Sequence, residues 1–125
     1  MPFDIPARSP ISDIDIIMEI RDRIGSPDKW VQGRFTQGDR HCLVAALSLA
    51  CGSRSFSVPN NVERRIARKL ASQLPPAMDL WSRLRLFSAR QRLMSFNDDT
   101  ERCHADVIAL VDQTVEYLLK VPQYA

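Results

Sequence analysis

The chain has 125 residues, which is the size of one domain rather than several. Hydrophobic residues make up 45% and charged residues 26%, and these globular values exclude a largely disordered chain. The 17 basic and 15 acidic residues leave a formal net charge of only +2, so the overall charge favours no class of partner.

The first predicted element is a helix that follows an irregular N-terminal arm. Residues 1–11 contain three prolines and form the expected arm, and a single helical domain is predicted over 12–121. Ser12 is a typical N-cap residue, while Gly25 and Pro27 end the helical pattern. The predicted apolar face of this helix consists of Ile14, Ile17, Met18 and Ile24.

The middle of the chain predicts a buried central helix. Residues 26–39 lack a clear periodicity and are interpreted as an ordered loop or a short pair of strands. The next helix is expected over 40–51, capped by Asp39 and ended by Gly52. Its side chains are apolar almost all round, which is typical of a helix surrounded by others. The sequence therefore predicts an all-α fold, a compact bundle of about five helices around this central helix.

Three further helical segments complete the predicted bundle. Asn60 or Asn61 is expected to cap a third helix that reaches about residue 74. A fourth helical stretch is predicted over 78–94, followed by a turn over 96–100. The last helix is predicted over 101–120. Its apolar face consists of Cys103, Val107, Leu110, Val111, Thr114 and Leu118.

The cysteines and the N-terminus indicate the compartment. Cys42, Cys51 and Cys103 form an odd set, and the first residues lack the basic and apolar regions of a secretory signal. The longest nearly apolar run, 42–51, is far shorter than the roughly 20 residues that a membrane span requires. We therefore expect a cytoplasmic protein with free thiols and no membrane segment.

Positive charge is concentrated in one part of the chain. Residues 54–92 hold nine basic and two acidic residues, whereas 93–125 hold two basic and six acidic residues. The candidate binding residues are Arg64, Arg65, Arg68, Lys69, Arg83, Arg90 and Arg92. Such a basic region, over 64–92, can bind phosphates or an acidic protein surface, or can pair with the acidic last helix within the chain or across a homodimer.

This charge distribution predicts a binding or regulatory module that engages a protein or another anionic partner. A nucleic-acid-binding accessory protein is an alternative, although no recognition-helix signature and no aromatic stacking platform accompanies the basic residues.

A cysteine hydrolase is the second alternative. Cys42 falls in the first turn of the predicted central helix, where the helix dipole lowers a thiol pKa. Gln37 could stabilise an oxyanion, and His104 could act as a base oriented by Asn97 or Asp98. Papain-like enzymes arrange Cys, Gln and His similarly but place the His on a sheet, and no convincing strands are predicted here. We favour the simpler interpretation of a buried core cysteine in a protein that is not an enzyme.

Metal binding is also considered and not favoured. The pairs His41–Cys42 and Cys103–His104 offer the ligand types that zinc prefers. Adjacent residues on a helix point about 100° apart, so His41 and Cys42 cannot easily chelate one ion together, and Cys42 and Cys103 both lie on faces that are predicted to be buried. The oxygens of 97–100 could hold a cation, but calcium loops need more ligands and a glycine. We therefore predict no metal and no cofactor.

Three short segments carry a resemblance to a known family. Trp30–Gly33, Cys42–Leu47 and Phe96–Asp98 resemble a family of small bacterial and phage proteins with no assigned function. That family has a Trp-x-Gln-Gly loop, a Cys-x-x-Gly-Ala-Leu helix and an Asn-Asp turn before its final helix. Ala45 stands where the family usually has Gly, which keeps a small residue at a close helix contact. The resemblance covers roughly 30–115 and implies a fold but no mechanism.

Overall fold

The structure is a computed structural model that describes residues 12–75 and 88–121. Within these residues it contains five α-helices, one short 3-10 helix and a two-stranded sheet, so the prediction of a mainly all-α compact fold is confirmed. The predicted N-terminal arm, Arg83 and the first part of the predicted fourth helix lie outside the described residues.

The first helix, α1, spans Asp13–Arg23 and begins at the predicted cap, because the Ser12 hydroxyl accepts a hydrogen bond from the Asp15 amide at 3.1 Å. Its buried side chains are Ile16, Ile17, Ile20 and Ile24. The predicted face is wrong at Met18, which is 42% exposed. Both α2 and α6 pack against α1, so two neighbouring helices determine which side of α1 is buried, and Met18 lies outside that side.

The segment that follows α1 contains the short pair of strands. A 3-10 helix, η2, spans Pro27–Lys29, and β1 (Thr36–Gln37) pairs antiparallel with β2 (Arg40–His41). Gly38 lies in the tight connection between the strands and has a φ of 61°, a conformation that favours glycine. Of the two structures left open for this segment, the strand pair is therefore the one observed.

The central helix, α2, spans Leu43–Ala50 and is shorter than the predicted 40–51. Its start was predicted wrongly, because the residues before it pair as β2 and cannot join the helix. The N-cap is Cys42 rather than Asp39, and the Cys42 sulfur accepts a hydrogen bond from the Ala45 amide at 3.3 Å.

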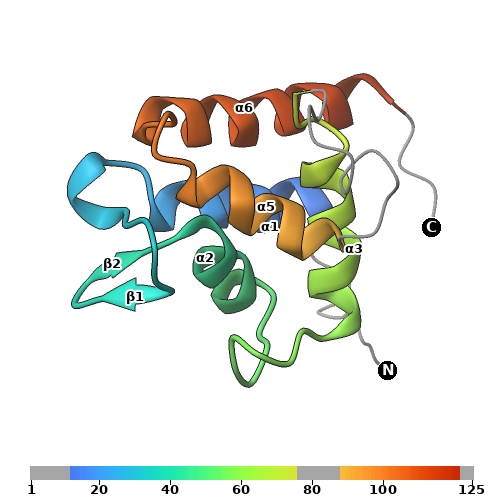
Figure 1. Ribbon diagram of the computed structural model, residues 1–125. Helices are drawn as coiled ribbons and strands as arrows, with labels where there is room; N and C mark the ends of the chain where they lie inside the picture. Colours follow the sequence, from blue (N-terminus) through green and yellow to red (C-terminus); the bar gives the residue numbers. More distant parts are fainter. Residues whose placement is uncertain (1–11, 76–87, 122–125) are drawn as a thin grey trace.

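The central position of α2 is confirmed. All side chains of 43–48 are buried, including that of Ser48. The helix packs against α1 and, in the second half of the chain, against α3 (Asn61–Ala71) and α5 (Ala89–Asp98). Figure 1 shows α2 below α5, with α3 standing on one side and the β1–β2 hairpin on the other.

The predicted fourth helix is wrong at its described boundaries. Ser88 is in an extended conformation and caps α5, so no helix runs through this residue. The helix also continues past residue 94, which places Asn97 and Asp98 in its last turn instead of in a loop. The favourable N-cap at Ser88 explains the start, because its hydroxyl satisfies a backbone amide that the helix leaves unpaired.

The last helix, α6, spans His104–Lys120 and lies across one side of the molecule, over α1 and α5 in the view of Figure 1. Val107, Leu110, Val111, Thr114 and Leu118 are buried, as predicted. Cys103, however, is the exposed N-cap of the helix and not part of its apolar face. No helix of the described residues is long and apolar enough to cross a membrane.

Candidate functional site

The structure brings the described part of the basic region together. Arg64, Arg65, Arg68 and Lys69 lie on α3, and Arg90 and Arg92 lie on α5. These two helices pack directly against each other. The sequence predicted a helix at both places, with other boundaries for the second one, but it did not show which of the charges are already neutralised within the fold.

Two of the α3 cations are bound by α1. Asp13 accepts a hydrogen bond from Arg65 Nη2 at 2.9 Å and also forms an ion pair with Lys69. Partial burial raises the pKa of Asp13, but the hydrogen bonds from Arg65 and Lys69 outweigh this effect and hold the pKa below its ordinary value. The ionised carboxylate thus contacts both cations and balances one of their two charges, and it comes from the first helix rather than from the acidic last one.

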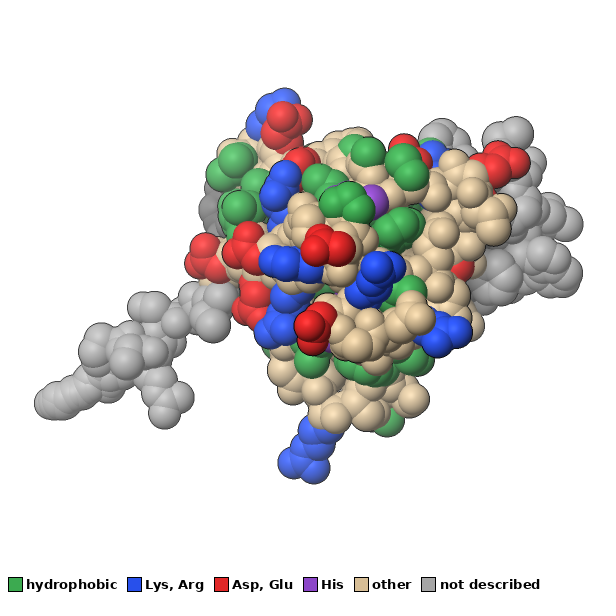
Figure 2. Space-filling model, turned by 90° about the vertical axis from the view of Figure 1, so that its left-hand side faces the viewer, with side chains coloured by type: hydrophobic (Ala, Val, Ile, Leu, Met, Phe, Trp, Pro, Cys, Tyr) green, Lys and Arg blue, Asp and Glu red, His purple; other side chains and the backbone are tan. Residues whose placement is uncertain are grey.

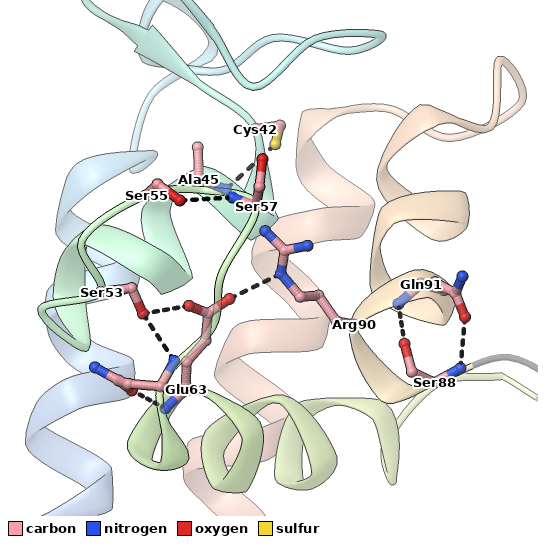
Figure 3. Close-up of polar contacts among 10 residues, drawn as sticks. Cys42, Ala45, Ser53, Ser55, Ser57, Glu63, Ser88, Arg90 and Gln91 are labelled. Carbon is pink, nitrogen blue, oxygen red and sulfur yellow. Dashed lines mark hydrogen bonds and ion pairs between the residues drawn. The ribbon is translucent and has the colours of Figure 1, made fainter.

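A third cation is compensated inside the protein, as Figure 3 shows. Glu63 is fully buried, accepts a hydrogen bond from the Ser53 hydroxyl at 2.5 Å and forms an ion pair with Arg90 Nε at 2.9 Å. The Arg90 guanidinium also lies over the Phe35 ring, 5.7 Å from its centroid. Arg90 therefore helps to join α3 and α5, and its charge is not available to a partner. The only hint of this role in the sequence was a lone acidic residue on a basic helix.

A hollow of about 590 Å³ lies between α3 and α5. Its described lining includes Glu63, Arg64 and Arg68 from α3, and Ser88 and Arg90 from α5. Arg64 and Arg68 are exposed and lie one helical turn apart on the same face. Arg64 Nη1 donates to the Asn61 side chain at 3.1 Å, and neither arginine forms an ion pair with another of the described residues.

The opposite wall of the hollow is the beginning of α5. The Ser88 hydroxyl accepts from the Gln91 amide at 3.1 Å, and the Gln91 side chain accepts from the Ser88 amide at 2.8 Å. This reciprocal capping fixes the first turn of the helix. The positive end of the α5 dipole therefore faces the same hollow as the two arginines.

The residues of the predicted hydrolase do not form a catalytic arrangement. Cys42 is only 3% exposed, and this burial raises the pKa of its thiol despite the hydrogen bond from the Ala45 amide. His104 Nε2 lies 2.6 Å from the Ile24 carbonyl oxygen, and Gln37 is exposed on β1. No hydrogen bond joins Cys42 to His104 within the part of the chain that the structure describes.

Asn97 has a different role from the predicted one of orienting His104. Its side chain is fully buried, and its oxygen accepts from Trp30 Nε1 at 2.6 Å and from the Leu43 amide at 3.1 Å. Its amide nitrogen donates to the Val31 carbonyl at 3.2 Å and to the Asp98 carboxylate at 2.9 Å. A single side chain thus joins the Trp30 loop, the start of α2 and the end of α5.

Two neighbouring residues reinforce this junction. Gln32 Nε2 donates to the carbonyls of Asn97 and Asp99, both at 2.9 Å. The Gly33 amide donates to the Asp98 carboxylate, also at 2.9 Å. The segments around residues 30–33, 42–47 and 96–98, which are far apart in the sequence, therefore meet at one place. These hydrogen bonds join the segments to one another, which indicates a structural function for this cluster.

Comparison with known proteins gives the family. A family of unknown function, DUF6197, matches residues 8–117. The chain belongs to this family. No curated protein and no solved structure matches it. Membership of DUF6197 supplies neither a ligand nor a reaction.

Among the described residues of this DUF6197 protein, no three His, Cys, Asp or Glu side chains are grouped so that they could hold a metal ion. Charged residues elsewhere on the surface are mixed. Figure 2 shows that the face on the side of the β1–β2 hairpin carries basic, acidic and apolar side chains next to one another. The hollow between α3 and α5 combines concave shape with uncompensated charge, and it is the candidate functional site.

Proposed function

We propose that this protein is a binding module that engages an anionic group of a partner protein through the hollow between α3 and α5. The observation that supports the proposal is the placement of Arg64 and Arg68, two exposed cations one turn apart on the wall of a hollow. Charge-assisted hydrogen bonds from guanidinium groups to an anion are about twice as strong as neutral ones, and a concave surface limits the competition from water.

A partner protein fits this arrangement better than a nucleic acid does. A nucleic-acid backbone is bound by a series of cations that follow the strand, often with aromatic side chains for base stacking. Of the described cations on α3, Arg65 and Lys69 share the carboxylate of Asp13, so Arg64 and Arg68 are the one pair on this helix without an acidic partner among the described residues. The cysteine hydrolase has no comparable support, because its thiol is buried and its imidazole is bound elsewhere.

We further propose that residues 12–121 act as one domain in the cytoplasm. Cys42, Cys51 and Cys103 are all free thiols in the structure, and one of them is exposed. Exposed free thiols persist in a reducing compartment, where disulfides are rare.

The test of the proposed function is binding of a ten-residue polyglutamate peptide in about 0.1 M salt, followed by amide chemical shifts of the protein. Amides around Arg64, Arg68 and Ser88 should shift, and the double substitution R64E/R68E should weaken binding by at least about tenfold, since it removes two charge-assisted contacts.

The matched control is R34E/R40E, which changes the net charge equally. Both control arginines are exposed: Arg40 lies on β2 and Arg34 lies two residues before β1, and the β1–β2 hairpin stands away from α3 in Figure 1. Binding should change less than about twofold in this control, because well-separated surface charges are screened at a distance of about 10 Å. Equal losses in the two double variants, or no loss in either, would contradict the proposal.

A further inference from the structure

The charge of its lining restricts the ligand that the hollow can accept. Among the described residues the lining contains three arginines and one glutamate. Glu63 and Arg90 compensate each other through their 2.9 Å contact, so Arg64 and Arg68 leave two positive charges. A group with two negative charges balances this lining, whereas one carboxylate or one internal phosphodiester leaves one positive charge uncompensated.

We infer that the hollow binds a phosphomonoester, the group on a phosphorylated serine or threonine side chain of the partner protein. This inference rests on the proposed function and names the chemistry of its ligand. A phosphomonoester has a second pKa of about 6, so near neutral pH it carries almost two charges and has three acceptor oxygens. The planar guanidinium group of arginine presents several N–H donors in an arrangement that matches two phosphate oxygens at once, and its charge is opposite to theirs.

The two walls of the hollow supply donors from different directions. Arg64 and Arg68 project from one face of α3. On the other wall, the backbone N–H groups of Ala89 and Arg90 have no acceptor within α5 and point toward its N-terminal end, whereas that of Gln91 donates to the Ser88 hydroxyl. The Ser88 hydroxyl accepts from the Gln91 amide and the Gln91 side chain accepts from the Ser88 amide, so the capping box holds the wall in place.

The size of the hollow agrees with a phosphorylated side chain. A volume of about 590 Å³ is typical of a site for a small ligand and is far more than a bare phosphate ion fills. The remaining space can accept the side chain that carries the phosphate and part of its backbone. A polynucleotide, in contrast, offers internal phosphates that each carry one negative charge, so one such phosphate balances only one of the two arginines.

The experiment compares two five-residue peptides with blocked ends that differ at one position, phosphoserine or glutamate, by chemical-shift titration of the full chain. At pH 7.5 the phosphoserine peptide should bind at least about tenfold more tightly. At pH 5.5, below the second pKa of about 6, this preference should fall below about threefold. The substitution R68Q should remove the preference at pH 7.5, and R40Q should leave it unchanged.

The outcomes separate this inference from the proposed function. Equal affinity for the two peptides, with both dependent on Arg64 and Arg68, would overturn the phosphomonoester and leave the anion-binding module intact. If neither peptide binds, both the phosphomonoester inference and the proposed anion-binding function are overturned. A thymidine oligonucleotide that binds more tightly than the phosphoserine peptide, and loses affinity in R68Q, would also overturn the inference, because it would show recognition of phosphodiesters.

Discussion

The substitution Asn97→Ala tests whether one buried side chain joins three distant segments. It removes the acceptor of both Trp30 Nε1 and the Leu43 amide, and the donor to the Val31 carbonyl. Leu43 is fully buried, so its amide stays unpaired, which costs about 1–3 kcal/mol. Trp30 is only partly buried, so its indole N–H can form a hydrogen bond with water instead, and its loss of a partner lowers the stability by a smaller amount.

We therefore expect N97A to lower the free energy of unfolding by about 2–4 kcal/mol, a large part of the roughly 5–15 kcal/mol that is usual for a domain. Urea unfolding followed by circular dichroism measures this quantity. The control is N61A, because Asn61 is exposed and its side chain contacts only Arg64 among the described residues; its effect should stay within about 0.5 kcal/mol. If N97A and N61A are equally stable, the junction does not hold the fold together.

Three further predictions follow from the buried and paired groups. E63Q should destabilise by about 3 kcal/mol in urea unfolding, because it leaves the Arg90 charge without its partner; wild-type stability would contradict this. Iodoacetamide labelling and mass spectrometry at pH 8 should modify exposed Cys103 first, since burial raises the pKa of Cys51 to about 12; faster labelling of Cys51 would refute it. Because the pKa of Asp13 is lower in the folded protein than in the unfolded chain, its ion pairs stabilise the fold at pH values above the ordinary pKa, and this stability is lost below about pH 4. The free energy of unfolding of D13N should therefore depend less on pH in the acid range than that of the wild type. An unchanged pH dependence would show that the ion pairs contribute nothing.

Much of the helical framework was predictable from the sequence. The start of α1 at Ser12 and that of α3 at Asn60 follow from side chains that cap within three residues, and the buried face of α6 follows from its apolar period. The apolar composition of α2 likewise predicted its central position. Such signals are local, because a helix repeats every 3.6 residues and a cap acts on the next turn.

The boundaries that failed are those where tertiary contacts compete with a local pattern. The predicted central helix began at residue 40, but His41 pairs with Thr36 across the hairpin and so belongs to a strand. The first part of the predicted turn, 96–98, is helical, since Asn97 is held at the end of α5 by partners in the Trp30 loop and at Leu43. A local pattern cannot weigh these contacts, because the partners of Asn97 lie up to 67 residues away.

The candidate site shows the same division. The sequence alone determined that positive charge gathers within residues 54–92, since charge is a property of composition. Only the tertiary structure decided which charges are available: Asp13 compensates Arg65 from 52 residues away, and Glu63 compensates Arg90 from 27 residues away. The physical reason is that an ion pair depends on the distance between two groups in space, and this distance is fixed only when the helices pack.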